Sequence, residues 1–307
     1  MSFDFGGNLR RAWEITWKYK ILWLFGILSA LAGGRASLNF NNGPRFPNGF
    51  DPTDPNAFPR LQRNFPSLTQ NTIIGIGLGI LCLAIIIGIV LFVLHIIGRG
   101  GLIGGIQLAD TTGQVSFGQA WGIGVKHFWT VLLIGLIVAI AAGILGIASI
   151  FAAATVCLIP LACIGFLLVA ALGVFAYLAQ IAAVTENLSF SEAIGRALAI
   201  VQANVGSVLL LAVLLTIIDG ILSFIIALPL GIVFAPVLAA MFAAANGNQQ
   251  AAGAALAISG LCLVIYIPIL IVLRGIVETW IVSNWTLAYK QLGTQRGPAV
   301  AAAPMAS

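Results

Sequence analysis

Three charged residues lie inside stretches that are otherwise apolar, and they are the first candidates for chemistry. Asp219 lies in the middle of one apolar run, and Arg274 and Glu278 lie four residues apart in another. Because four residues make about one helical turn, Arg274 and Glu278 share a helix face and can neutralise each other. Asp219 then needs a partner of its own, and Arg274 or Arg99 can supply it.

The cluster of Asp219, Arg274, Glu278 and Arg99 has two interpretations. A charge at the centre of a membrane helix costs about 2.5–3.5 kcal/mol on insertion scales, so each one needs a compensating role. Either the cluster forms structural ion pairs that hold helices together, or it is a translocation or proton-relay site. The sequence favours the structural interpretation and leaves the other open.

The two histidines, His95 and His127, are the second group of candidates. His95 lies near the end of the second apolar run and His127 opens the third, which predicts both imidazoles at similar depth toward the cytoplasmic face. Two such imidazoles could ligate a haem or a chlorophyll. Interfacial histidines more often form hydrogen bonds, and this interpretation is preferred. No cofactor is predicted, and a tetrapyrrole is the remote alternative.

The other motifs favour packing over catalysis. No GxSxG, HExxH, Walker lysine loop or cysteine–histidine cluster is present. We therefore predict no enzyme and no metal site, with Asp51 and Asp54 assigned to Asp-Pro turns rather than to calcium. Three GxxxG pairs predict close helix packing: Gly75/Gly79, Gly100/Gly104 and Gly101/Gly105. The four cysteines are interpreted as packing residues: Cys82, Cys157, Cys163 and Cys262.

The composition predicts the environment in which these residues lie. Of 307 residues, 60% are hydrophobic and 7% are charged, whereas soluble proteins carry about 25% charged residues. Most of the surface must therefore face lipid. The formal charge of +5 comes from scattered lysines and arginines without a basic patch, so no nucleic acid is expected as a partner.

Six apolar runs predict a single multipass membrane domain over residues 1–293, with a flexible tail at 294–307. The predicted spans lie at about 18–34, 72–98, 127–153, 158–184, 205–231 and 254–287. Pro229 and Pro236 are expected to break or kink the fifth span. The first span resembles later segments, so we expect it to be retained rather than cleaved as a signal peptide.

The distribution of lysine and arginine predicts the orientation. Residues 35–71 form the long polar stretch of the chain, and the larger number of basic residues lies on the opposite side of the predicted membrane. Positive residues favour the cytoplasmic side. We therefore expect loop 35–71 outside the cytoplasm and both termini inside it.

Three segments of similar pattern precede the first, third and fifth spans: Leu9–Trp13, Phe117–Trp121 and Phe190–Ile194. Val115-Ser116-Phe117 also matches Leu188-Ser189-Phe190. Self-similarity of this kind indicates repeated structural units. The predicted fold is an all-α membrane protein with six transmembrane helices, arranged as three repeats of an interfacial helix followed by a helical hairpin.

Three stretches carry a resemblance to known proteins: NLRRAWEITWKYKILWLFGIL, VSFGQAWGIGVKHFWTVLLIGLI and LSFSEAIGRALAI. They resemble a broad group of uncharacterised bacterial six-helix membrane proteins, similar to the membrane domain fused to some glycerophosphoryl diester phosphodiesterases. The resemblance implies a bacterial cytoplasmic (inner) membrane and the six-helix fold. The phosphodiesterase barrel is absent from the sequence, so that activity is not implied.

Two functions are compatible with these observations. The first is a non-enzymatic accessory, scaffold or assembly subunit of a larger membrane complex, with the lipid bilayer and other membrane subunits as partners. The second is a transporter or lipid-handling protein that uses the Asp219, Arg274 and Glu278 cluster. An enzyme that acts on lipid is a weaker third possibility.

Overall fold

The computed structural model describes residues 4–31, 70–153, 159–246 and 248–294, and each regular element in these ranges is an α-helix. The helices are α1 (Phe5–Lys18), α2 (Ile21–Leu31), α4 (Gln70–Thr112), α5 (Phe117–Lys126), α6 (Phe128–Ala153), α7 (Ile159–Thr185), α8 (Phe190–Ala203), α9 (Val205–Ala245) and α10 (Gln249–Thr294). The predicted loop 35–71, the predicted tail and Cys157 lie outside the described residues, apart from boundary positions.

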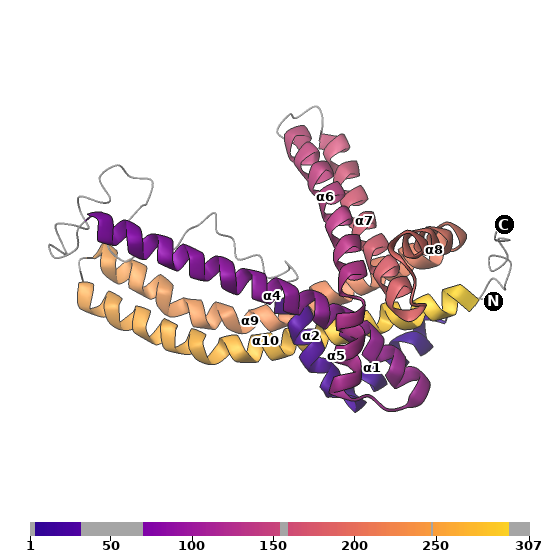
Figure 1. Ribbon diagram of the computed structural model, residues 1–307. Coiled ribbons are helices and arrows are strands. Elements are labelled where there is room, and N and C mark those ends of the chain that lie inside the picture. The colour runs from indigo at the N-terminus through magenta and orange to yellow at the C-terminus, as the bar shows by residue number, and fades with distance from the viewer. Residues whose placement is uncertain (1–3, 32–69, 154–158, 247, 295–307) are drawn as a thin grey trace.

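The helices form a body from which two arms extend (Figure 1). The body contains α1, α2, α5, α8 and the ends of the longer helices that pack against them. The long arm consists of the outer parts of α4, α9 and α10, with α9 packed on α10. The hairpin arm consists of α6 and α7, which pack against each other.

Burial divides each long helix into an arm part and a body part. In α10, side chains between 253 and 273 are mostly exposed, whereas every side chain from Val277 to Tyr289 is buried. In α4, the side chains at 77–90 are exposed and those at 100–106 are buried. The exposed parts are apolar, as surfaces in contact with hydrocarbon must be. The arms therefore have the character of membrane helices, and the body has its own packed interior.

Five described helices are long and apolar enough to cross a membrane: Gly77–Thr112, Phe128–Ala153, Pro160–Thr185, Val205–Gly231 and Gly253–Gly293. They correspond to five of the six predicted spans, and they support a multipass α-helical membrane protein. The predicted span at 18–34 corresponds to α2, which has 11 residues. A helix of this length rises about 16 Å, roughly half of the hydrocarbon core. The sixth crossing stays a prediction.

Three helices run past their predicted ends, and the shortest extension is that of α10, which continues to Thr294. α4 continues through its glycine-rich stretch to Thr112. α9 continues through Pro229 and Pro236 to Ala245, so the predicted break of the fifth span does not occur. Proline removes a hydrogen bond from a helix. Membrane helices tolerate this loss because neighbouring side chains and local adjustments satisfy the freed backbone groups.

Two of the three predicted GxxxG pairs pack closely, and the third faces open space. A Cβ atom at Gly101 would lie 2.8 Å from the Phe25 ring of α2, and one at Gly100 would lie 3.2 Å from Cα of Gly124 in α5. Around Gly79 no atom lies within 4 Å of such a Cβ. The glycines of α4 therefore let α2 and α5 approach its backbone in the body, which confirms the packing interpretation there.

The amphipathic helices α1, α5 and α8 begin with related caps. Asp4 accepts a hydrogen bond from the backbone N–H of Gly7 at the start of α1, and Ser116 forms a capping box with Gln119 in α5. In α8, Glu192 accepts from the backbone N–H and the hydroxyl of Ser189 at 2.9 and 2.7 Å. These two bonds lower the pKa of the Glu192 carboxyl. Such caps satisfy N–H groups that a helix start leaves free.

Candidate functional site

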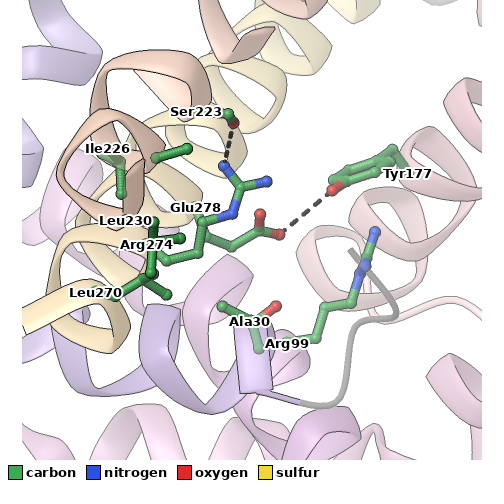
Figure 2. Close-up of a pocket in the computed structure, with 11 residues that line it drawn as sticks. Ala30, Arg99, Tyr177, Ser223, Ile226, Leu230, Leu270, Arg274 and Glu278 are labelled. Atoms are coloured by element: carbon green, nitrogen blue, oxygen red, sulfur yellow. Dashed lines mark hydrogen bonds between the residues drawn. The ribbon is translucent and has the colours of Figure 1, made fainter. Parts of the chain in front are cut away.

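A cavity of about 340 Å³ lies where the arms join the body (Figure 2). It is formed by α2, α4, α7, α9 and α10. Its polar lining consists of Ser29, Arg99, Tyr177, Ser223, Arg274 and Glu278. Its apolar lining consists of Ala30, Ile226, Ala227, Leu230 and Leu270. The volume lies in the range of small-molecule sites. Three of the four residues of the predicted cluster thus line one cavity, and the fourth, Asp219, contacts it through Arg274.

Arg274 of α10 contacts two acceptors on α9. Its Nη1 lies 3.0 Å from Oδ1 of Asp219 and donates to Oγ of Ser223 at 2.7 Å. Asp219 and Ser223 are four residues apart, so α9 presents both acceptors on one face. The predicted Asp219–Arg274 contact is confirmed. Asp219 also makes at least one interaction besides this ion pair.

Glu278 does not pair with Arg274, although their spacing permits it. Its Oε1 accepts a hydrogen bond from the hydroxyl of Tyr177 at 3.3 Å, and its side chain is buried. No ion pair within 4.0 Å joins Glu278 to a described cation. Figure 2 shows the Arg274 guanidinium turned toward Ser223 and the Glu278 carboxylate turned toward Tyr177. Partners on α9 and α7 therefore replace the intrahelical pair expected from the sequence.

Arg99 lies on the other side of Tyr177. Its Cζ is 4.1 Å from the centroid of the Tyr177 ring, a cation–π contact. Within the described part of the chain no carboxylate lies within 4.0 Å of Arg99, so Arg99 is not the partner of Asp219. Tyr177 consequently contacts both an arginine and a glutamate, and it connects the hairpin arm with α4 and α10.

Within the part of the chain that the structure describes, two buried polar atoms at the cavity have no hydrogen-bond partner. They are Nε of Arg99 and Oγ of Ser29. Ser29 is only 1% exposed. Leaving a buried polar group without a partner costs about 1–3 kcal/mol, and native proteins rarely accept this cost without a reason. Both residues line the cavity, so its wall includes two residues with hydrogen-bonding capacity that the described residues do not use.

Both histidines form hydrogen bonds. Nδ1 of His95 lies 2.6 Å from the backbone carbonyl oxygen of Ser29. Nδ1 of His127 lies 3.0 Å from the carbonyl oxygen of Ile123, and its Nε2 lies 3.0 Å from Oδ1 of Asn187. A histidine that ligates the metal of a tetrapyrrole needs a free ring nitrogen. Both ring nitrogens of His127 are engaged in hydrogen bonds. Among the described residues, no group of three or more metal-ligating side chains occurs.

Sequence reasoning missed Ser29, Tyr177 and Ser223, because uncharged polar residues are common in membrane helices. The spacing of Ser223 from Asp219 was a usable signal, since it places both on one helix face. It also missed Asp110 near the C-terminal end of α4. Asp110 lies 3.5 Å from Arg11 of α1 and 2.8 Å from Lys290 of α10, so it ties the first and last helices of the body to α4.

The comparisons with known proteins add no further constraint. No protein-family model, curated protein or solved structure matches the chain. The resemblance to six-helix bacterial membrane proteins thus stays a prediction, and the function has to be inferred from the geometry of the cavity.

Proposed function

We propose that the protein is a non-enzymatic membrane protein that binds an amphipathic molecule, a lipid, in the cavity at the base of its arms. The observation that carries this proposal is the composition of the cavity wall. Ser29 and Arg99, each with one buried polar atom that has no partner among the described residues, line the same cavity as the apolar side chains Ile226, Leu230 and Leu270. A molecule with a polar head and an apolar tail matches both parts.

The position of the cavity supports a lipid over a soluble ligand. Ala227 is exposed, and its neighbours on α9 include the exposed side chains of Phe224 and Leu228. The apolar wall is thus continuous with the surface that the long arm presents to hydrocarbon. A lipid could enter from the bilayer with its tail along α9.

The contacts favour binding over catalysis. Catalytic hydroxyls are activated by a base within hydrogen-bond distance. His95 contacts the backbone carbonyl of Ser29 instead of its hydroxyl, and Asp219 is engaged by Arg274. Among the described residues that line the cavity, no base is placed on a serine hydroxyl, and the one carboxylate on a hydroxyl, Glu278 at Tyr177, lies at 3.3 Å.

Blocking the apolar wall tests this function. Ala227→Trp should lower the lipid occupancy of the purified protein about tenfold, because the indole fills the space of the acyl chain. Ala239→Trp is the matched control, since Ala239 is also an exposed alanine of α9 but does not line the cavity. Native mass spectrometry in a mild detergent measures bound lipid. Equal occupancy in both variants would contradict the proposal.

A second candidate is the accessory or assembly subunit of a larger membrane complex. It is favoured by the separation of the hairpin arm from the long arm (Figure 1), which leaves the sides of α6 and α7 open to other membrane helices. Purification in a mild detergent discriminates the two. A stoichiometric protein partner supports the second candidate, and a chain that carries lipid without a partner supports the first.

We further infer a three-unit architecture in a bacterial inner membrane, with both termini cytoplasmic. The order of elements supports it, since α1, α5 and α8 each precede apolar helices and begin with a side-chain cap. The contact of Asn8 in α1 with Asn284 in α10 supports termini on the same side of the membrane.

Cysteine labelling tests this topology. In a variant without the four native cysteines, Ser37→Cys and Ser67→Cys should react with a membrane-impermeant maleimide added outside intact cells. Ser307→Cys should react only after the cells are opened. Labelling of Ser37→Cys from the inside alone would reverse the orientation.

A further inference from the structure

The four charged residues at the cavity sum to zero formal charge, but only two of them form an ion pair with each other. Arg274 and Asp219 neutralise each other at 3.0 Å. Arg99 and Glu278 remain, one positive and one negative, and neither has an ion-pair partner within 4.0 Å among the described residues. Tyr177 lies between them, with Arg99 against its ring and Glu278 at its hydroxyl. Counted over the described residues, the cavity therefore offers one cation and one anion without an ion-pair partner, and both contact Tyr177.

We propose that the cavity selects a zwitterionic phospholipid whose headgroup carries a phosphate and a primary ammonium, as phosphatidylethanolamine does. This rests on the proposed function, that the cavity holds a lipid. The phosphate would lie at the guanidinium of Arg99 and beside Ser29, two lining residues that each have a polar atom without a partner among the described residues. The ammonium would lie at the carboxylate of Glu278.

The remaining lining places the acyl chains. Leu230 and Leu270 lie on the arm side of Arg274, toward the exposed parts of α9 and α10. Figure 2 shows both leucines and Ile226 on α9 and α10, apart from Arg99 and Tyr177. The lipid would thus be held with its head toward the body and its tails along the long arm.

Charge compensation disfavours the other common headgroups. An anionic lipid such as phosphatidylglycerol would neutralise Arg99 but leave Glu278 without a counter-charge in a poorly solvated site, and such a charge is costly. Phosphatidylcholine would supply the positive charge, but its quaternary ammonium has no N–H to donate to Glu278. A primary ammonium provides both the charge and the hydrogen bond.

Lipid titrations followed by native mass spectrometry test the selectivity. The full chain in dodecyl maltoside is titrated separately with dioleoyl phosphatidylethanolamine, phosphatidylcholine and phosphatidylglycerol, and with soluble phosphoethanolamine. Phosphatidylethanolamine should bind about tenfold more tightly than either other lipid. Phosphoethanolamine as tight as the lipid would overturn the assignment to a lipid.

Two variants assign the headgroup contacts. Arg99→Gln should weaken binding of all three lipids about tenfold, because each uses its phosphate. Glu278→Gln should abolish the preference for phosphatidylethanolamine and favour phosphatidylglycerol. Arg10→Gln and Glu14→Gln are matched controls at a surface pair, with Arg10 84% exposed, and should leave binding unchanged.

The outcomes separate this inference from the proposed function. If phosphatidylglycerol binds most tightly and Arg99→Gln and Ala227→Trp still weaken it, the cavity holds a lipid but the zwitterion assignment is wrong. If neither variant changes the affinity for any lipid, both proposals fall. Should Arg99→Gln not fold, Ala227→Trp and Glu278→Gln still decide the two questions.

Discussion

Replacing Arg274 with leucine is expected to lower the free energy of unfolding by about 3–5 kcal/mol, the usual cost of leaving a buried charge without its partner. Arg274 is the cation that binds both Asp219 and Ser223 of α9, at 3.0 and 2.7 Å. The substitution would remove the arginine from the Asp219 carboxylate, whose side chain is only 18% exposed. Equilibrium unfolding in mixed detergent micelles, followed by circular dichroism, measures the change.

A second substitution identifies the partner of Arg274. The variant with Arg274→Leu and Asp219→Leu should regain most of the lost stability, because both members of the ion pair are then removed. The variant with Arg274→Leu and Glu278→Leu should not regain it, since Glu278 is hydrogen-bonded to Tyr177 instead. Rescue by the change at Glu278 and not by the change at Asp219 would contradict the observed pairing.

The sequence predicted which charged residues belong together, but not how they pair. Asp219 and Arg274 stood out because charges are rare in apolar runs, and the structure brings them into contact. The i, i+4 spacing suggested an intrahelical pair of Arg274 with Glu278. That spacing shows only that the two side chains can meet within one helix. The choice between Asp219 and Glu278 depends on how α9 and α7 pack on α10, which the sequence pattern of α10 does not contain.

The helices themselves were predicted from apolar runs, and their ends were not. Hydropathy located five of the spans because a bilayer selects for apolar length. It ended the second span near residue 98, where the apolar run meets Arg99. In the structure the helix continues through Gly100 and Gly101. Without side chains, these glycines let Gly124 and Phe25 pack against the backbone of α4. The end of α4 is therefore set by its packing against α2 and α5, and it lies beyond the end of the apolar run.

The crossing of α2 and α10 is the second position at which a large effect is expected. Gly26 and Gly275 face each other there, so that a Cβ at Gly26 would meet the carbonyl oxygen of Gly275. A Cβ at Gly275 would lie 2.9 Å from the backbone nitrogen of Ile27 and 3.1 Å from its Cα. These are backbone atoms, so no side-chain rotation can relieve the contact. Thr279 adds a hydrogen bond across the crossing to the carbonyl of Leu22 at 3.2 Å.

Gly275→Ala should therefore lower the free energy of unfolding by about 1–3 kcal/mol, the usual cost of overpacking, and Gly275→Leu by more. Gly260→Ala in the same helix is the matched control, because no atom lies within 4 Å of a Cβ at that position. There alanine should be neutral or stabilise the helix by up to about 1 kcal/mol. Unfolding in mixed micelles measures both, and equal effects at the two glycines would contradict the close crossing.

The same substitution connects the crossing to the cavity. Ser29 and Ala30 lie at the end of α2, one helical turn beyond Gly26, and both line the cavity. Displacing α2 from α10 would move the Ser29 hydroxyl relative to Arg99, the two groups proposed to bind the phosphate. Gly275→Ala should thus weaken lipid binding as well as stability, whereas Gly260→Ala should change neither to a comparable extent. A variant that loses stability but binds phosphatidylethanolamine as tightly as the native chain would show that α2 does not position the headgroup.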